Sequence, residues 1–424
     1  MPADEQDSNS TLGNLIAQRI AESFQQRLTF AEYMELALYH PEQGYYATNA
    51  AVIGASGDFF TSPHLGADFG ELLADQFVQM WDILQRPTPF TLVEMGAGQG
   101  LLAGDILRYV QRQYPEFLRS LEYIIVERAA ALIAEQQRQL KALAASGIPL
   151  HWRSLEDIAP HSITGCFFSN ELVDAFPVHQ VMLLSGQLQE LYVTTRNHKQ
   201  ERSEKASSVK DSGENETAQF DEVSGALSTP QLAKYFELVG IDWAAQDYPD
   251  RYRSEVNLAA LDWMHLVADR LQRGYVLTID YGYTSARYYS PTRPQGTLQC
   301  YYQHTHHANP YLHVGRQDIT AHVDFTALER QGEACGLSTI GLTQQSLFLM
   351  ALGLGDRIVA LSQSTATDAP GMQAILHQRN ALHLLINPMG LGNFGVLVQA
   401  KGLTSSESVH PLKGLSGLSS YATS

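Results

Sequence analysis

Glu94-Met95-Gly96-Ala97-Gly98-Gln99-Gly100 joins a short apolar run, residues 90–95, to an amphipathic helix expected at about 101–110. Glycine is needed where a turn is sharp and where a ligand must approach the backbone without an intervening Cβ. In open parallel sheets, ligands bind beyond the carboxyl ends of the strands. The segment therefore predicts a cofactor-binding turn between a strand and a helix, with Gly96, Gly98 and Gly100 presenting backbone to the ligand.

Two cofactors compete for this turn. A nicotinamide dinucleotide favours G-x-G-x-x-G, because its pyrophosphate lies at the helix N-terminus. Here the spacing is G-x-G-x-G and Leu101 follows. S-adenosylmethionine carries a sulfonium and an amino-acid end instead of a phosphate, and Glu94 could hold the amine or water network at that end. The spacing favours S-adenosylmethionine.

Further acids are expected along the same edge of the sheet. Glu127 ends the apolar run 123–126, where a carboxylate would bind the ribose hydroxyls. The loop at 152–157 follows the next expected strand, with Glu156 or Asp157 facing the adenine amine. A ligand-free glycine turn, with Glu127 as a surface carboxylate, remains the structural alternative.

The segment 169–177, Ser-Asn-Glu-Leu-Val-Asp-Ala-Phe-Pro, follows another apolar run at 166–168 and should reach the same edge. Asn170 is a further candidate for cofactor binding. Methyl transfer needs an aligned nucleophile. Glu171 and Asp174 could orient a guanidinium or amine and take up its proton, which makes them the candidate catalytic residues. An N-cap followed by an exposed turn would explain the same residues structurally.

Short apolar strands alternate with helical patterns through the chain, which predicts an α/β fold with a mainly parallel sheet covered on both faces. Further strands are expected at 275–279 and 396–398, and helices at about 129–144 and 256–271. We divide the chain into an N-terminal helical or lid region (1–88), a core (89–403) and a flexible tail (404–424). The polar stretch 195–222 is expected to be a disordered insertion, because it has too few apolar residues to offset its ordering entropy.

The N-terminal region shows two helical signals. Apolar residues recur at every fourth position in its first part, at Leu12, Ile16, Ile20 and Phe24. Ser62-Pro63 then predicts a helix start, with a capping hydroxyl and a proline at the first helical position.

Composition limits the possible partners and compartment. The formal charge of −17 disfavours binding to nucleic acid or to an anionic membrane. The three cysteines lie far apart, which fits a reducing compartment. The N-terminus shows neither a signal core nor a transit segment, and no apolar run is long enough for membrane insertion. We expect a cytoplasmic protein.

Several ordered motifs resemble those of the MidA-like family of methyltransferases, which includes a mitochondrial complex I assembly methyltransferase. They are Leu38-Tyr39-His40-Pro41 with Gly44-Tyr45-Tyr46, Gly57-Asp58-Phe59-Phe60-Thr61-Ser62-Pro63, Phe69-Gly70-Glu71-Leu72-Leu73, Asn170-Glu171 with Asp174-Ala175-Phe176-Pro177-Val178-His179-Gln180, Ile279-Asp280-Tyr281-Gly282, Thr297-Leu298-Gln299 and 318–325. The resemblance implies a class I methyltransferase (Rossmann-like) fold that uses S-adenosyl-L-methionine, with extra helical segments and insertions.

The same resemblance implies methylation of arginine in a protein substrate, such as a subunit of a complex I-like dehydrogenase. It also implies that Asp58, Thr61 and Ser62 close over the cofactor. His64-Leu65 stands where the mitochondrial members carry an acidic residue, and the insertion at 195–222 is local to this chain, so these departures bear on the protein target more than on the chemistry. The alternatives are a non-catalytic assembly factor that keeps cofactor binding, a small-molecule methyltransferase and a nicotinamide-dependent oxidoreductase.

His304, His306 and His307 lie close together, with His313 and His322 downstream. Histidine pairs can bind zinc or iron, but the stretch reads as loop. We therefore assign no metal site and expect these side chains to line or cover the substrate cleft.

Overall fold

The computed structural model describes residues 8–48, 61–196, 218–244, 247–303, 305–364 and 368–416. The chain divides into two compact units, and each is formed from segments that are far apart in the sequence. The accessory unit takes its described residues from the ranges 1–49, 175–259 and 286–321. The sheet unit takes its described residues from 50–174, 260–285 and 322–424.

The sheet unit is built on a seven-stranded sheet in the order β16-β17-β10-β5-β2-β3-β4. Neighbouring strands from β10 to β4 are parallel, whereas β17 is antiparallel to both β10 and β16. The strands are β2 (Phe90–Met95), β3 (Leu121–Val126), β4 (Leu150–Arg153), β5 (Ile163–Asn170), β10 (Leu271–Asp280), β16 (Ser338–Gln344) and β17 (Gly395–Lys401). The predicted α/β fold with a mainly parallel sheet is confirmed.

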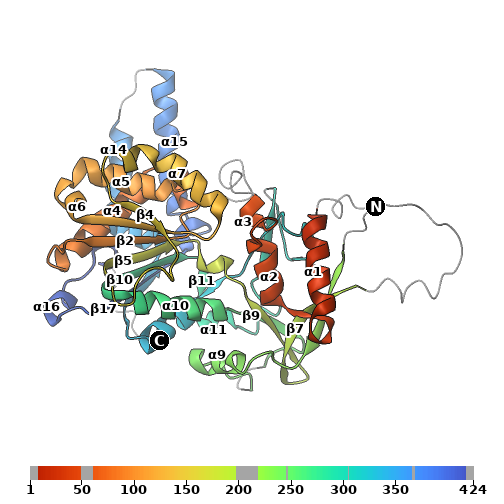
Figure 1. Cartoon of the computed structure of the whole chain (residues 1–424). Coiled ribbons are helices and arrows are strands. Elements are labelled where there is room, and N and C mark those ends of the chain that lie inside the picture. Colours follow the sequence, from red (N-terminus) through yellow and green to blue (C-terminus); the bar gives the residue numbers. More distant parts are fainter. Residues whose placement is uncertain are drawn as a thin grey trace, which may run out of the picture. The chain divides into compact units, whose positions relative to one another are not determined.

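Burial explains why these strands read as apolar runs rather than as alternating patterns. Every residue of β2 is buried, because helices cover both faces of the sheet. Figure 1 shows α4, α5 and α7 on one side of the sheet and α10 on the other. The helices of this unit are α4 (Asp68–Ile83), α5 (Leu101–Gln113), α6 (Pro115–Ser120), α7 (Ala130–Ala145), α10 (Leu258–Arg270), α12 (Phe325–Ala334), α13 (Gln345–Leu352), α14 (Leu354–Gln363), α15 (Ala369–Leu385) and α16 (Ser405–Ser408).

Short elements complete the sheet unit. Single 3-10 turns are η3 (Ser62–Leu65), η4 (Val173–Ala175), η5 (Leu391–Asn393) and η6 (Lys413–Leu415). A two-stranded pair joins β11 (Gly282–Tyr283) to β15 (Val323–Asp324). The short helix α11 (Ser285–Tyr288) begins at the last residue of this segment and otherwise belongs to the accessory unit.

The accessory unit has its own antiparallel sheet and its own apolar core. The buried core residues come from the N-terminal helices, from the sheet and from the strands after residue 298. Its elements are α1 (Ser10–Glu22), η2 (Phe24–Gln26), β1 (Leu28–Thr29), α2 (Phe30–Tyr39), α3 (Tyr45–Thr48), β6 (His179–Leu184), β7 (Gln187–Thr195), β8 (Phe220–Gly225), α9 (Gln231–Val239), β9 (Tyr252–Val256), β12 (Gln299–Tyr302), β13 (Thr305–His307) and β14 (Asp318–Thr320). The predicted stripe of Leu12, Ile16 and Ile20 is buried, whereas Phe24 lies beyond the helix end and is exposed.

The two compact units do not follow the domain boundaries drawn from the sequence. Residues 61–88 belong to the sheet unit rather than to a separate N-terminal region, because α4 packs its apolar face into the core of that unit. The predicted core 89–403 is interrupted twice by segments of the accessory unit, 175–259 and 286–321.

The helix predicted at Ser62-Pro63 begins later. Thr61 caps a single 3-10 turn, and the turn ends at Gly66, which has a φ of 131°. The long helix α4 starts only at Asp68. Ser62 is buried and lies close to the Gln345 side chain, so its hydroxyl has a role other than capping a helix.

Two segments expected to be flexible contain defined structure at their ends. Thr195 pairs with Phe220, so β7 and β8 extend into the predicted insertion 195–222, of which 197–217 lie outside the described residues. In the predicted tail, Leu412 is buried in the core and Gly414 packs on Phe348. Residues 417–424 lie outside the described part.

Within the described residues no single helix combines the length and hydropathy of a membrane span. The adjacent helices α13 and α14 reach that length and hydropathy only when they are taken together, and the chain bends by 65° between them.

Candidate functional site

Strand register brings the predicted cofactor residues to one edge of the sheet. Met95, the last residue of β2, pairs with Val126 on β3 and with Ser169 on β5. The residues that directly follow, Gly96, Glu127 and Asn170, therefore leave three adjacent strands at the same carboxyl edge. The Gly96 N–H also donates to the Val126 carbonyl at 3.0 Å, which fixes the start of the turn against β3.

The structure requires glycine at each of the three positions of the turn for a different reason. Gly96, Gly98 and Gly100 have φ values of 72°, 53° and 80°, a region that L side chains rarely adopt. A Cβ on Gly96 would lie 2.7 Å from a methyl carbon of Leu172, and a Cβ on Gly100 would lie 3.4 Å from the Gln136 side chain. A Cβ on Gly98 would meet nothing within 4 Å. The backbone at Gly98 therefore faces open space, as a ligand-binding turn requires.

The side chain of Gln136 ties the glycine turn to Glu127. This glutamine is fully buried on α7, and its Nε2 donates to the Gly98 carbonyl at 2.8 Å and to Glu127 Oε2 at 3.3 Å. Its Oε1 accepts from Trp152 Nε1 at 3.0 Å. The glycine turn and Glu127, which were expected at the same edge of the sheet, are thus joined through one amide group.

The Glu127 carboxylate is held in a defined orientation. Its Oε1 accepts from the N–H groups of Arg128 and Ala129 at 2.8 and 3.0 Å. Burial raises its pKa, and these two backbone donors, with Gln136, oppose the rise. Since Oε2 accepts only the longer bond from Gln136, it retains capacity for further donors such as a sugar diol.

Glu94 lies on β2 beneath the turn and is buried. Its Oε2 accepts from the Tyr123 hydroxyl at 2.6 Å. Burial raises the pKa of Glu94 to about 7, while the Tyr123 hydroxyl acts in the opposite direction. The group can thus change its protonation near neutral pH, which suits a residue that adapts to an amine or a water network.

Three carboxyl groups meet beyond the ends of β5 and β10. Glu171 adopts a φ of 53°, a strained conformation for a residue other than glycine. Burial raises its pKa to about 8, and the charge of Asp174 adds to the rise. Asp280 Oδ2 accepts from the N–H groups of Leu172 and Val173 at 3.2 and 2.9 Å, so it fixes the backbone between the two predicted catalytic acids.

The three acids of this carboxyl cluster, Glu171, Asp174 and Asp280, act on one another's ionisation. Burial raises the pKa of Asp280 well above its ordinary value, and the charges of Asp174 and Glu171 raise it further. Acids that oppose one another's ionisation gain most from a nearby positive charge. The arrangement can therefore bind a cationic group and accept a proton from it.

The segment predicted to close over the cofactor is only partly described. Asp58 lies outside the described residues. The Ser62 backbone acts to lower the pKa of Glu171, and Gln99 in the glycine turn acts to raise the pKa of His64, which burial lowers. Thr61 Oγ1 lies 2.7 Å from His64 Nδ1. Thr61 and Ser62 thus belong to the edge of the sheet that carries the glycine turn.

The remaining predicted cofactor residues differ in their surroundings. Glu156 and Asp157 follow β4 and are exposed, and the Asp157 N–H donates to Ser154 Oγ at 3.2 Å. Within the described residues, neither carboxylate forms a hydrogen bond or an ion pair with the glycine turn, so their role at the adenine remains a prediction. Asn170 Nδ2 donates to Glu171 at 3.0 Å, while the buried Asn170 Oδ1 has no hydrogen-bond partner among the described residues.

These features fit S-adenosylmethionine. The open space at Gly98, the oriented carboxylate of Glu127 and the orphaned oxygen of Asn170 are all features that a bound ligand would use. The glycine turn and Glu127 would hold the nucleoside, and Glu94 would hold the amino-acid end.

The histidine stretch belongs to the accessory unit except for His322, and His304 lies outside the described residues. The His313 ring stacks on Tyr302 with centroids 3.9 Å apart. Across the part of the chain that the structure describes, no group of three or more His, Cys, Asp or Glu side chains is arranged to hold a metal ion.

Three residues of the site were not selected from the sequence. Gln136 occupies a position on the apolar stripe of α7 between Leu132 and Leu140, and a glutamine in such a stripe is a usable signal of a buried hydrogen-bonding role. Asp280 lies at the end of a buried strand, and Glu127 directly follows one, so the search for acids at strand ends would have selected Asp280 as well. Trp152 gives no comparable signal.

Comparisons with known proteins agree with this geometry. A model of the family described as "Putative S-adenosyl-L-methionine-dependent methyltransferase" matches residues 72–343. The protein arginine methyltransferase NDUFAF7 homolog, mitochondrial, of Drosophila melanogaster is 29% identical over 407 residues, covering 91% of this chain and 84% of the relative. The human protein arginine methyltransferase NDUFAF7, mitochondrial, is 26% identical over 390 residues, covering 86% and 78%.

A solved structure is similar over nearly the whole chain. The crystal structure of a COG1565 superfamily member from Burkholderia thailandensis, bound to S-adenosyl-homocysteine, is 28% identical. The similarity covers 96% of this chain and 95% of that one, with a TM-score of 0.77.

Proposed function

The chain belongs to the family of S-adenosyl-L-methionine-dependent methyltransferases, and from that premise we propose that its methyl acceptor is an arginine side chain of a protein. The observation that carries this proposal is the carboxyl cluster of the buried Asp174 and Asp280 with the half-buried Glu171, in the same unit as the glycine turn. A guanidinium is planar, always charged and rich in N–H donors, so it matches a set of carboxylates better than a neutral acceptor does. The names of the relatives support the same acceptor.

The chemistry of the chain's own residues follows from their surroundings. When bound, S-adenosyl-L-methionine supplies an electrophilic methyl group. The carboxyl cluster orients the guanidinium so that one nitrogen faces that methyl group, which lowers the entropic part of the barrier. The nitrogen that gains the methyl group must lose a proton. Burial raises the pKa of Glu171 to about 8, so it can take that proton once it is ionised, at mildly alkaline pH or when the charge of a bound guanidinium lowers its pKa.

The substrate protein and compartment are finer parts of the proposal. The sequence motifs resemble those of a complex I assembly methyltransferase, which supports a subunit of a complex I-like dehydrogenase as the substrate. The three cysteines are free thiols, which supports a reducing compartment such as the cytoplasm. A fluorescent fusion of the full chain, expressed in its own host, tests the compartment; an extracytoplasmic signal would contradict it.

The acceptor is tested by methyl transfer from labelled S-adenosylmethionine to an extract of host cells that lack the gene. We expect label on arginine in at least one protein with the wild type, and at least about a tenfold lower rate with Glu171→Gln and Asp280→Asn. Glu329→Gln is the matched control, because Glu329 is also a half-buried acid with a raised pKa but lies on α12. Label on a small molecule, or cofactor binding without any transfer, would contradict arginine as the acceptor.

A further inference from the structure

The accessory unit contains a cavity of about 450 Å³ over one face of its antiparallel sheet. Arg253 and Glu255 lie two residues apart on β9, and Gln180 on β6 pairs with Glu255. Phe220 and Glu222 lie two residues apart on β8. Paired and alternate residues of a sheet face the same side, so the register through β7 puts these five side chains on one face. All five line the cavity, whose volume is typical of pockets that bind small organic groups.

The walls of the cavity include apolar surface. Phe220 is buried, and Leu298 and Tyr311 are half-buried. All three line the cavity, and the rings of Phe220 and Tyr311 lie 6.4 Å apart between centroids. Such walls suit an aliphatic stem, while the charged groups of the same cavity suit a polar head.

The charged residues of the lining do not balance. Arg196 Nη2 lies 2.8 Å from Asp221, and Arg253 Nη2 lies 2.9 Å from Glu222. Glu255, the remaining charged residue of the lining, forms no ion pair with any residue that the structure describes. The cavity therefore carries one carboxylate more than its own arginines neutralise.

The Glu255 side chain is 2% exposed, and its two oxygens have different surroundings. Oε2 accepts from the Thr297 N–H at 2.8 Å, from Thr297 Oγ1 at 3.0 Å and from the Tyr288 hydroxyl at 3.3 Å. Oε1 accepts no hydrogen bond from the described part of the chain. A Cβ on Gly296, where φ is 72°, would overlap Oε1, so glycine at this position leaves room for the carboxylate. One oxygen is thus fixed by the fold, and the other is left for a ligand.

Burial makes this remaining oxygen a strong acceptor for a cation. Burial raises the pKa of Glu255, while the backbone of residues 297–298 and the charge of Arg253 act in the opposite direction. A buried carboxylate is costly unless it is paired, so a positive charge at Oε1 would stabilise its ionised form.

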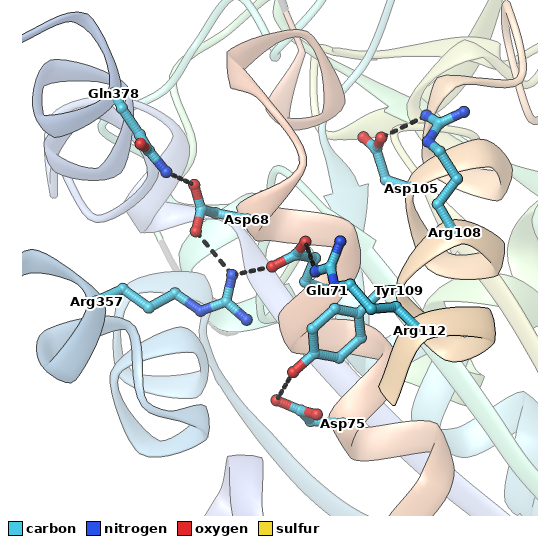
Figure 2. A network of polar contacts seen from close by, with 9 residues as sticks. All are labelled: Asp68, Glu71, Asp75, Asp105, Arg108, Tyr109, Arg112, Arg357 and Gln378. Atoms are coloured by element: carbon cyan, nitrogen blue, oxygen red, sulfur yellow. Dashed lines mark hydrogen bonds and ion pairs between the residues drawn. The ribbon is translucent and has the colours of Figure 1, made fainter. Parts of the chain in front are cut away.

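The sheet unit shows how this chain satisfies acids that lie close together. Figure 2 shows Arg357 of α14 between two carboxylates of α4, with Nη1 2.7 Å from Asp68 and 2.6 Å from Glu71. Arg112 Nη2 lies 2.8 Å from the same Glu71. Guanidinium groups of the chain itself neutralise those acids, whereas Glu255 has no such group of its own.

We propose that the cavity binds the positively charged side chain, arginine or lysine, of a protein partner, with Glu255 Oε1 accepting from its head group. Leu298 and Tyr311 would contact the aliphatic stem. Glu222 Oε2, which accepts no hydrogen bond from the described residues, provides a second acceptor at the same cavity. The formal charge of −17 favours approach of a basic partner. This binding does not depend on the proposed methyl acceptor.

The test is methyl NMR of the full chain, which follows the Leu298 methyl signals, assigned by their loss in Leu298→Ile. The probes are capped Gly-Arg-Gly and Gly-Lys-Gly peptides, and the matching citrulline peptide is the neutral control. We expect saturable shifts with at least one basic peptide, with a dissociation constant on the order of a millimolar, and at least about tenfold weaker binding of the citrulline peptide. Absence of a saturable shift with both basic peptides, or equal binding of the citrulline peptide, would overturn the proposal.

Glu255→Gln should weaken binding of the basic peptide at least about tenfold, because it removes the charge that attracts the head group. Glu222→Gln serves as the second variant if Glu255→Gln does not fold. Glu190→Gln is the matched control. Glu190 is also a buried acid of the accessory unit, but its Oε1 lies 2.8 Å from His179 Nδ1 and its Oε2 accepts from the Ser228 N–H at 2.5 Å.

Unchanged affinity in Glu255→Gln, or in Glu222→Gln where that variant replaces it, contradicts the proposal, as does an equal loss in Glu190→Gln. Agmatine carries a guanidinium on an alkyl stem without a peptide backbone. Comparable or weaker binding of agmatine supports a protein side chain, whereas binding at least about tenfold tighter than that of the peptides indicates a free cation and overturns the protein partner. The NMR readout needs no turnover, so failure of the proposed arginine methylation would be seen separately in the transfer assay.

Discussion

Gly98 has its positive φ without any crowding from its neighbours. At Gly96 and Gly100 the space for a Cβ is limited by Leu172 and Gln136, so packing alone could demand glycine there. At Gly98 nothing lies within 4 Å of an added Cβ, and the backbone turns with a φ of 53° toward open space. We interpret this space as the place of a ligand, because packing within the chain does not require a glycine there.

Gly98→Ala should therefore separate binding from stability. The added methyl group enters the ligand's space, and we expect the affinity for S-adenosylhomocysteine to fall at least about tenfold. The conformational cost of the left-handed alanine is about 1–2 kcal/mol. Calorimetry and thermal unfolding check both effects. Gly147→Ala, at a φ of 89° and also in open space, is the control for strain alone and should leave the affinity unchanged.

Glu171 should make the protein less stable as the pH rises. Burial raises its pKa from the ordinary 4.5 to about 8, so between these values the folded state binds more protons than the unfolded state. The free energy of unfolding then falls with increasing pH through this window and levels off above it. Glu171→Gln removes this contribution. Its melting temperature should decline less than that of the wild type between about pH 5 and about pH 8. Parallel declines would count against a raised pKa at Glu171.

At the scale of elements, local patterns predicted the strands and helices that carry the glycine turn. The run 90–95 is β2, and the helices expected at 101–110 and 129–144 are α5 and α7 with small changes at their ends. The prediction failed where long-range contacts decide the structure. Ser62-Pro63 has a good helix-start sequence, but Ser62 is held by Gln345, which lies far along the chain, and Gly66 ends the turn.

The buried face of α7 provides an element-scale prediction. Gln136 links this helix to the glycine turn, to Glu127 and to Trp152, so Gln136→Met should loosen all three and weaken S-adenosylhomocysteine binding about tenfold. Gln139→Met on the same helix is the control, because Gln139 is exposed and bonds only Glu135. Equal affinities in the two variants, measured by calorimetry, would show that the buried amide is not part of the site.

The segment after residue 404 provides a second prediction at the scale of elements. Its Ser and Gly content predicts a flexible tail, but Leu412 is fully buried in the core of the sheet unit. Leu412→Ala should lower the free energy of unfolding by about 2–5 kcal/mol, because it leaves a cavity. Val409→Ala removes an exposed side chain from the same segment and should have little effect. Denaturant unfolding distinguishes the two; similar midpoints would refute packing of this segment.

At the scale of the whole molecule, the sequence predicted the fold class and the glycine–Glu127 pair but not the division into units. Glycine turns and strand-ending acids can be read locally, because each directly follows an apolar run. The strands β6 to β9 lie in a sheet of their own, apart from the central sheet. Only their pairing with one another, β6 with β7 and β9, separates them from it. Asp280 and Gln136 could have been selected from local patterns of the same kind, but their partners, which lie on other segments of the chain, could not.

Cofactor binding at the glycine turn and Glu127 is tested most directly by calorimetric titration of the full chain with S-adenosylhomocysteine, wild type beside Glu127→Gln. The amide keeps the size of the side chain but loses the negative charge that attracts a diol. We expect one ligand per chain for the wild type and an affinity lower by about tenfold or more for the variant. No binding by the wild type, or equal binding by both proteins, would contradict a cofactor site at this edge of the sheet.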